Sequence, residues 1–212
     1  MKKYLTAAIC AGLLSCASAN ATLVDFVAEA AGNERGVADG TTINFGGLDV
    51  TFSSLTDDLF FAYFDDVSNG PGGLGACKEL ISGPGSACLD PSDDNIREGD
   101  AVTVTFGETV NLSNLSFSDK DHQSLNFNDT NSLLIAINDP MAFASYTFAE
   151  ATMLVIAGVD LIRFSFDNSG SGREFYVNSF EASTVPIPAA LPLFISALFG
   201  LGFASRRGRK ST

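Results

Sequence analysis

The sequence predicts an all-β protein, an antiparallel sandwich of two sheets, between an N-terminal signal peptide and a C-terminal transmembrane helix. Short runs alternate apolar with polar residues, as in Val102–Phe106 and Ile162–Phe166, and a period of two is typical of strands buried on one face. Turn sequences such as Asn69-Gly70 and Asn138-Asp139-Pro140 separate these runs. Many short strands without a long amphipathic helix favour two packed sheets.

Further alternating runs predict strands at Thr41–Phe45, Leu48–Ser53, Leu59–Phe64, Leu112–Ser118, Gln123–Phe127, Leu133–Ile137, Ala144–Phe148, Met153–Ala157 and Arg173–Ala182. Only Leu23–Ala31 tolerates a turn or two of helix. The chain has 18 Phe and no Trp, which predicts a Phe-filled interior. We expect four of these rings inside: Phe106, Phe117, Phe164 and Phe166.

The N-terminus, residues 1–21, has the pattern of a secretory signal peptide. Lys2 and Lys3 precede an apolar run, Tyr4–Cys16, and an Ala-x-Ala site ends at Ala21. Cleavage there would start the mature chain at Thr22. Leu13–Cys16 loosely resembles a lipobox, which would instead lipidate Cys16; the Ala-x-Ala site favours ordinary cleavage. Both alternatives predict export.

The predicted exported domain, residues 22–184, is long enough for one proper core. It contains all 25 acidic residues but only six of the 12 basic ones, a net charge of −19. Such a field repels nucleic acid and anionic lipid. We therefore exclude nucleic acid as a partner.

Two cysteines, Cys77 and Cys88, remain after signal-peptide removal, both in a Gly/Pro-rich segment. An isolated pair in an oxidising compartment predicts a disulfide. A structural zinc site needs four nitrogen or sulfur ligands, and the chain has a single His. The disulfide is the preferred interpretation.

The last 28 residues have three parts. Pro186 and Pro188 keep the chain extended. Uncharged residues follow to Ala204, and the 16 residues of Ala189–Ala204 would span about 24 Å as a helix, a minimal crossing of a bilayer core of about 30 Å. A basic cluster then follows, which should stay cytoplasmic: Arg206, Arg207, Arg209 and Lys210.

This tail resembles the PEP-CTERM sorting signal of exported proteins in exopolysaccharide-making Gram-negative bacteria. The resemblance rests on the motif Val185-Pro186-Ile187-Pro188, the apolar helix with Gly200-Leu-Gly202, and the basic cluster. Ile187 stands where the name-giving motif has glutamate, and Val-Pro-x-Pro looks like a common variant. The resemblance implies recognition by an exosortase, a membrane-embedded cysteine transpeptidase, and only transient anchoring in the inner membrane. An ordinary single-pass anchor is the alternative.

A second resemblance covers the middle of the chain. Gly73-Leu-Gly75, the loop Asp94-Asn-Ile-Arg-Glu98 and the runs Ala101–Phe106 and Val110–Phe117 resemble many PEP-CTERM exported domains. Those domains have a Gly-Leu-Gly turn, an acidic loop and jelly-roll strands. The Gly-Glu pair that closes their loop is reversed here, as Glu98-Gly99. The resemblance implies a jelly-roll-like sandwich and no particular chemistry.

The best candidate for a binding site is a calcium site. Five carboxylates occur within eleven residues after Cys88: Asp90, Asp93, Asp94, Glu98 and Asp100. Calcium takes six to eight oxygen ligands, and Asp65 and Asp66 could add to the set. The spacing does not match an EF-hand. A solvated acidic loop that keeps the protein soluble is the preferred alternative.

No catalytic motif is visible. His122 could act as a base with Asp119 or Asp121, but no nucleophile motif accompanies it, so an exposed turn residue is the preferred interpretation. Among 25 acidic residues, sequence alone cannot select a hydrolytic carboxylate pair. Sugar-stacking tyrosines cannot be placed either, since Tyr63, Tyr146 and Tyr176 all lie in predicted strands.

We therefore expect an exported, non-enzymatic, structural or adhesive protein of the cell envelope or exopolysaccharide matrix. Its expected partners are an exosortase, transiently the inner membrane, and exopolysaccharide. Calcium is the one candidate cofactor. The alternative is a secreted polysaccharide-acting hydrolase or carbohydrate-binding module that carries the same sorting signal.

Overall fold

The computed structural model describes residues 21–54, 61–67, 70–91, 94–125 and 129–184. These residues belong to one compact unit, Asn20–Val185. The predicted C-terminal helix, the sorting motif and all of the signal peptide except Ala21 lie outside the described residues. Within the described ranges, no helix is long and apolar enough to cross a membrane.

The predicted all-β class is confirmed, since strands dominate and the two described helices have five residues each. The elements in chain order are β1 (Ala21–Asp25), α1 (Phe26–Ala30), β2 (Arg35–Val37), β3 (Thr41–Phe45), β4 (Leu48–Ser53), β5 (Phe61–Val67), β6 (Gly70–Cys77), β7 (Ala101–Asp119), β8 (Ser124–Leu125), β9 (Ser132–Ile137), β10 (Phe143–Thr147), α2 (Phe148–Thr152), β11 (Ile156–Phe166) and β12 (Phe175–Thr184).

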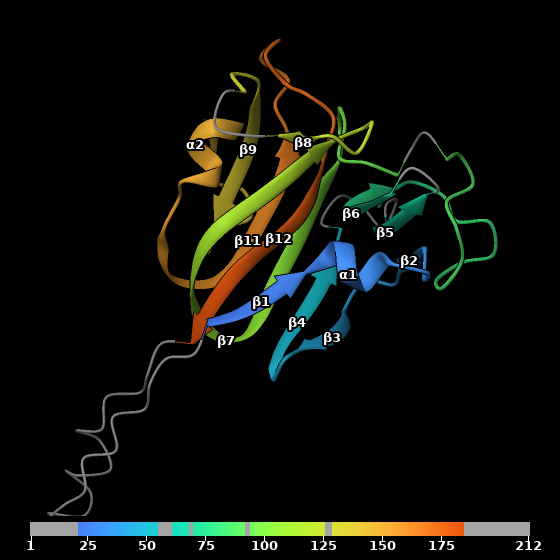
Figure 1. Ribbon diagram of the computed structural model, residues 1–212, viewed down its shortest axis with the longest axis horizontal. Coiled ribbons are helices and arrows are strands. Elements are labelled where there is room, and N and C mark those ends of the chain that lie inside the picture. The colour runs from blue at the N-terminus through green and yellow to red at the C-terminus, as the bar shows by residue number, and fades with distance from the viewer. Residues whose placement is uncertain (1–20, 55–60, 68–69, 92–93, 126–128, 185–212) are drawn as a thin grey trace, which may run out of the picture. The chain divides into compact units, whose positions relative to one another are not determined.

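All described strands belong to one antiparallel hydrogen-bonded network, with the main order β10-β9-β11-β7-β12-β6-β5-β2. The long strands β7, β11 and β12 run side by side through its centre (Figure 1). β1 adds to β12, β3 and β4 form a hairpin on β7, and β8 pairs with the end of β7. The strands that the sequence assigned to two sheets are therefore joined in one hydrogen-bonded network.

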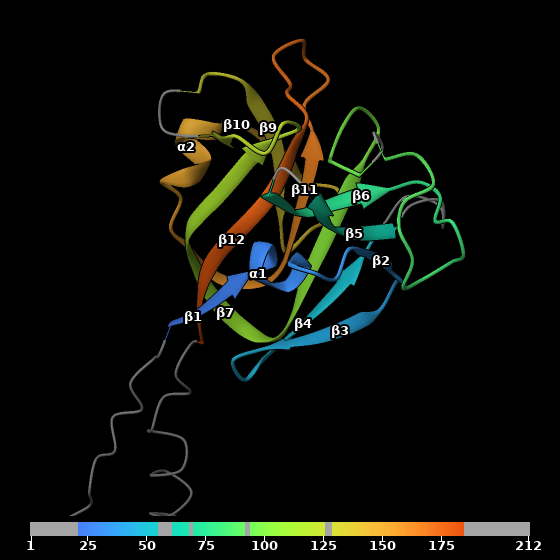
Figure 2. The same ribbon diagram turned by 45° about the vertical axis from the view of Figure 1, so that its right-hand side comes forward.

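The length of β7 explains this difference. The sequence predicted two strands here, Val102–Phe106 and Leu112–Ser118, but the backbone stays extended through the segment between them. β4 pairs with the first half of β7, opposite Thr103 to Phe106. β12 pairs with the second half, from Val110 to Asp119. A single strand thus serves two groups of partners, and β4 and β12 leave it in different directions (Figure 2).

A core rich in phenylalanine fills the interior. Phe26 of α1 makes edge contacts with Phe45, Phe52 and Phe180, at ring-centroid distances of 5.4–5.8 Å. Such edge-to-face pairs are favourable beyond the area that they bury. α1 thereby fills the space between the β3–β4 hairpin and β12. Among the four rings expected inside, Phe106, Phe117 and Phe164 are buried and Phe166 is half-buried.

Two elements differ from the prediction. The run Gly70–Cys77 forms strand β6, although its Gly and Pro residues indicated a loop. The predicted strand Ala144–Phe148 corresponds to β10, whereas only Ile156 and Ala157 of the predicted strand Met153–Ala157 belong to β11. Between them lies α2, which a capping box starts: the Thr147 side chain accepts from Glu150 N, and the Glu150 carboxylate accepts from Thr147 N. Local capping therefore overrode the alternating pattern.

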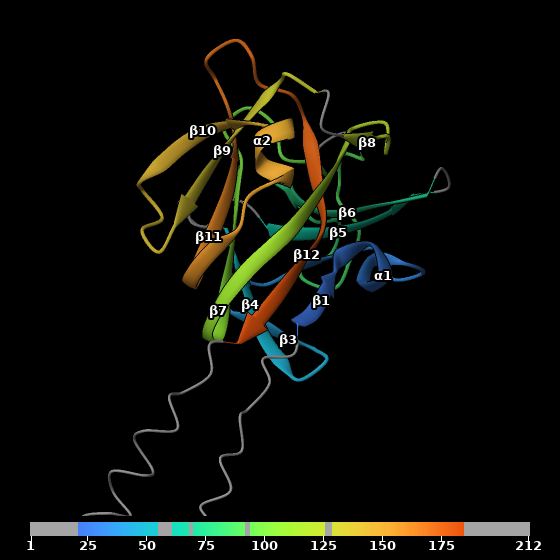
Figure 3. The ribbon, with the colours of Figure 1, turned by 60° about the vertical axis from the view of Figure 1, so that its left-hand side comes forward.

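The two ends of the described domain lie next to each other. β1 pairs antiparallel with β12, and Ala21 faces Ser183 across the ladder. Figure 3 shows β1 beside the end of β12. The segments that precede and follow the domain are therefore joined to it at neighbouring positions on one ladder.

Candidate functional site

Four polar side chains from four distant segments meet inside the domain. Asp65 lies on β5, Asp94 in the loop between β6 and β7, His122 in the turn between β7 and β8, and Tyr176 on β12. We call these four residues the buried acidic cluster. Asp65 is 0% exposed, Asp94 4% and Tyr176 1%, and the His122 side chain is 7% exposed.

Short polar contacts hold the cluster together. His122 Nε2 lies 3.0 Å from Asp65 Oδ2. The Tyr176 hydroxyl donates to Asp94 Oδ1 at 2.6 Å. The His122 and Tyr176 rings contact each other edge to face at 5.2 Å between centroids. Each acidic group thus has one close polar neighbour from another segment.

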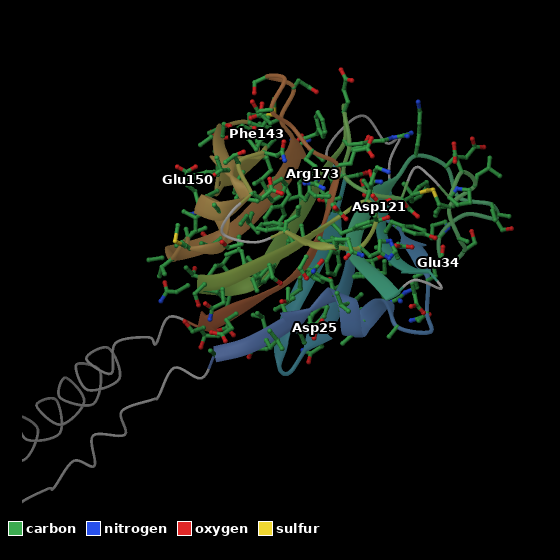
Figure 4. All side chains as sticks on the ribbon, turned by 45° about the horizontal axis from the view of Figure 1, so that its top comes forward. Asp25, Glu34, Asp121, Phe143, Glu150 and Arg173 are labelled. Carbon is green, nitrogen blue, oxygen red and sulfur yellow. A yellow bond between two sulfur atoms is a disulfide. The ribbon has the colours of Figure 1, made fainter. Side chains whose placement is uncertain are left out.

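The turn that carries His122 is shaped by Asp119. Its Oδ1 accepts from Asp121 N and Gln123 N, at 3.0 and 2.9 Å, and His122 takes a left-handed φ of 60°. Arg173 Nη2 donates to Asp119 Oδ2 at 2.7 Å. The preferred expectation of an exposed turn residue is corrected: His122 lies in a turn, but its side chain is 7% exposed and turns inward to Asp65. The alternative partners are engaged elsewhere, since Asp119 accepts hydrogen bonds within the turn and Asp121 contacts Lys120. Asp121 and Arg173 are labelled in Figure 4.

Two glycines of β6 allow the cluster to close. A Cβ at Gly75 would lie 1.9 Å from the backbone oxygen of Asp94, and one at Gly72 would lie 2.5 Å from Asp65 Oδ2 and 3.0 Å from the Tyr176 ring. Real atoms cannot approach so closely. Gly73-Leu-Gly75, which the resemblance implied to be a turn, is therefore part of a strand, and the small residues make room for the acidic loop.

Burial changes the proton affinity of these groups. Loss of hydration and the nearby Asp94 raise the pKa of Asp65 from 3.8 to about 7, while His122 opposes the rise. Burial also raises the pKa of Asp94, against the hydrogen bond from Tyr176. The pKa of the Tyr176 hydroxyl is raised by burial and by both carboxylates. Near neutral pH, Asp65 therefore exchanges a proton readily.

The predicted disulfide lies beside the cluster and is confirmed: Cys77 and Cys88 are bonded, with Cα atoms 5.9 Å apart. Both cysteines are buried in a small apolar group with Tyr63 and Leu80. The Tyr63 hydroxyl donates to Glu34 and accepts from Cys88 N at 3.1 Å. Tyr63 thus fixes the disulfide loop to β5.

The predicted calcium ligands do not converge. Asp94 turns inward to Tyr176, and Asp100 is buried and accepts from Arg97 N at 3.3 Å. Asp90 and Glu98 are exposed, and Asp93 lies outside the described residues. In the described part of the chain, no three His, Cys, Asp or Glu side chains are grouped to hold a metal ion. Internal hydrogen bonds thus engage two of the five carboxylates, Asp94 and Asp100.

The cluster offers a carboxyl–imidazole pair, Asp65 and His122. Ser118 is paired with Tyr176 across the ladder, and its hydroxyl lies 2.8 Å from Asn178 Oδ1 and 3.1 Å from Gly72 O. Tyr63 and Tyr176, considered above as sugar-stacking rings, are both buried, and Tyr146 is half-buried. The geometry suits a group that fixes the loop between β6 and β7 to the sheet. The histidine was visible in the sequence; its partner, 57 residues earlier on β5, was not.

No family profile, no curated protein and no solved structure matches this chain.

Proposed function

We propose that the chain is an exported, structural or adhesive β-domain that an exosortase sorts to the cell envelope or the exopolysaccharide matrix of a Gram-negative bacterium. The domain is not assigned a catalytic role. Its partners are the processing enzyme, the inner membrane during sorting, and exopolysaccharide at its destination. A two-sheet, jelly-roll-like arrangement is the finer fold description that accompanies this proposal.

The observation that carries the proposal is where the sheet ends. β12 finishes at Thr184, and the motif Val185-Pro186-Ile187-Pro188 begins at the next residue. Thr184 still pairs with Val110 of β7. Cleavage at or after the motif would therefore release the domain without removing a residue of the described sheet.

The disulfide supports export. Structural disulfides persist in oxidising compartments outside the cytoplasm. Cys77 and Cys88 are both buried against Tyr63, so their bond is part of the packing. The ladder between β1 and β12 fits as well, because a chain that starts at Thr22 keeps four of its five residue pairs.

The alternative of a polysaccharide hydrolase is supported less well. A glycosidase needs two carboxyl groups on either side of an accessible sugar bond. Asp65 and Asp94, the carboxyls that the fold brings together, are 0% and 4% exposed. A polymer cannot reach them while the loop between β6 and β7 is in place.

The test is to determine the termini of the protein recovered from a host with an exosortase, by intact-mass spectrometry. We expect an N-terminus at Thr22 and loss of the segment after the motif. Replacing Pro186 and Pro188 together by Ala should leave the tail attached, and replacing Asn178, which lies outside the motif, by Ala is the control. A full-length C-terminus on the wild-type protein would exclude processing and leave the plain anchor.

A further inference from the structure

Arg163 is a buried cation on the face of β11 that points away from the phenylalanine core. Its neighbours Ile162 and Phe164 belong to the core, and successive side chains of a strand point to opposite faces. Arg163 is nevertheless only 4% exposed. Its side chain is covered from the side of β10 and the turn that leads into it.

The contacts of Arg163 leave one edge of the guanidinium unused. Nη1 donates to Pro140 O at 3.1 Å and lies 4.0 Å from Met141 Sδ. The guanidinium carbon lies 5.3 Å from the centre of the Phe143 ring. Nε is buried and has no hydrogen-bond partner. Among the described residues, no carboxylate forms an ion pair with Arg163.

Thr103 presents a second unpaired polar atom at the same place. It faces Arg163 across the β7–β11 ladder, and side chains directly opposite in such a ladder share a face, with Cβ atoms about 5 Å apart. Thr103 is 0% exposed, and its hydroxyl has no hydrogen-bond partner. The Thr103 hydroxyl and Arg163 Nε are both buried without a hydrogen-bond partner. This arrangement is unfavourable unless a third group forms hydrogen bonds with both.

Arg35 shows which partner Arg163 lacks, namely a carboxylate. Its guanidinium also lies over a ring, 4.9 Å from the centre of Phe64, but it forms an ion pair with Glu29. Burial alone acts on Arg163 and lowers its pKa, because no described carboxylate stands in the place that Glu29 takes at Arg35. Of the two arginines that lie over a ring in the described residues, Arg35 thus has an anionic partner and Arg163 has none.

We propose that Arg163 and Thr103 bind a carboxylate group that is not part of this chain. The Nε–Nη2 edge of a guanidinium presents two parallel donors that match the two oxygens of a carboxylate. The Thr103 hydroxyl donates a third hydrogen bond to one of these oxygens. The ligand is a small organic acid or a single acidic sugar, which share this group.

Entry requires rearrangement, because Thr103 is 0% and Arg163 4% exposed. Met141, whose Sδ lies 4.0 Å from Nη1, is 77% exposed. Met is unbranched and flexible, so rotation about its side-chain bonds can uncover the guanidinium. The hydrogen bond from Nη1 to Pro140 O can persist, because Nη1 is not part of the Nε–Nη2 edge that binds the carboxylate. Phe143, labelled in Figure 4, then forms one wall of the site.

The test measures thermal unfolding of the full-length chain by circular dichroism, with sodium acetate or sodium glucuronate titrated against sodium chloride at equal ionic strength. A ligand that binds only the folded state raises Tm with its concentration. We expect both carboxylates to raise Tm and chloride not to. A lower apparent Kd for glucuronate would identify a sugar acid as the natural ligand, and equal values would identify a simple organic acid.

Three variants make the result specific. Thr103→Val keeps the shape but removes the hydroxyl, and should weaken binding about 10-fold. Arg163→Lys keeps the charge but loses the fork, and should weaken binding at least as much. Arg35→Gln is the matched control and should respond as the wild type does. Equal melting in carboxylate and chloride, or an undiminished response of the well-folded Thr103→Val variant, would overturn the proposal.

Discussion

The Tyr176 hydroxyl donates a hydrogen bond to Asp94, 82 residues earlier in the chain, at 2.6 Å. This bond joins the last strand of the sheet to the loop between β6 and β7. A second link follows at once, because Ile96 N donates to Phe175 O at 2.8 Å and Phe175 N returns a bond to Ile96 O at 3.2 Å. The loop is therefore fixed to β12 by three hydrogen bonds over neighbouring residues.

Removing the Tyr176 hydroxyl should destabilise the domain. In Tyr176→Phe the buried Asp94 oxygen loses its donor, and an unsatisfied buried acceptor costs about 1–3 kcal/mol. The measurement is the midpoint of urea unfolding, converted to a free energy of unfolding. Tyr146→Phe is the control, because Tyr146 is half-buried and no hydrogen bond of its hydroxyl occurs within the described residues. Equal, small changes in both variants would contradict the role given to Tyr176.

Stability should fall as the pH rises from about 4 to 7. The pKa of Asp65 is raised from 3.8 to about 7 in the folded protein, so within this window the folded state binds more protons than the unfolded state. The free energy of unfolding then decreases with increasing pH. Each pKa unit corresponds to about 1.4 kcal/mol, so the loss is at most about 4 kcal/mol. Asp94 and Glu34 strengthen the effect, and His122 opposes it.

Asp65→Asn should remove most of this pH dependence. The amide stays neutral at all these pH values, so the variant should gain stability relative to the wild type as the pH rises from about 4 to 7, and the difference should level off above 7. Asp121→Asn is the matched control. Asp121 directly precedes His122 in the sequence, but its side chain is 69% exposed. The measurement is urea unfolding at pH 4 to 8. An Asp65→Asn profile parallel to that of the wild type would assign the titration to another group.

A methyl group at Gly75 should be tolerated less well than one at Gly36. At Gly75 the new Cβ would lie 1.9 Å from the backbone oxygen of Asp94, and at Gly36 it would lie 2.4 Å from a terminal carbon of Leu80. The Leu80 side chain can rotate, whereas the backbone next to Asp94 is held to β12 by the hydrogen bonds between Ile96 and Phe175. Overpacking a core typically costs about 1–3 kcal/mol and occasionally more. We expect Gly75→Ala to cost more than about 3 kcal/mol and Gly36→Ala to fall within the typical range. The reverse order of Tm values would contradict this.

Loss of the disulfide should lower stability by about 2–3 kcal/mol, the chain-entropy estimate for a short ring. Cys77 and Cys88 are 11 residues apart, and both are nearly fully buried. The measurement compares Cys77→Ser/Cys88→Ser with the wild type in urea, with and without a reducing agent. The reducing agent should lower the midpoint of the wild type and leave the double variant unchanged. A wild type that does not respond would mean that the bond is not formed in solution.

Much of the fold could be predicted from local pattern, because a strand with one buried face alternates residue by residue. β3 and β4 begin and end where the alternation does, and β9 and β12 differ by one or two residues at their ends. The errors occurred where another force outweighed the pattern. Between the predicted strands Ala144–Phe148 and Met153–Ala157, the capping box of Thr147 and Glu150 started a helix, and the next strand begins only at Ile156. At Gly70–Cys77, pairing with β5 and close contact with the acidic loop made a strand of residues that have little strand propensity.

The sequence by itself determined the β class, the disulfide between Cys77 and Cys88, and a Phe-rich core, because alternation, cysteine number and composition are local properties. Only the tertiary structure decided that His122 lies against Asp65, that Asp94 accepts a hydrogen bond from Tyr176, and that Arg163 and Thr103 share an unpaired buried position. These contacts join residues far apart in the chain, and which of 25 carboxylates meets a given partner depends on strand register and loop path. Neither the strand register nor the loop path follows from the spacing of the residues along the sequence.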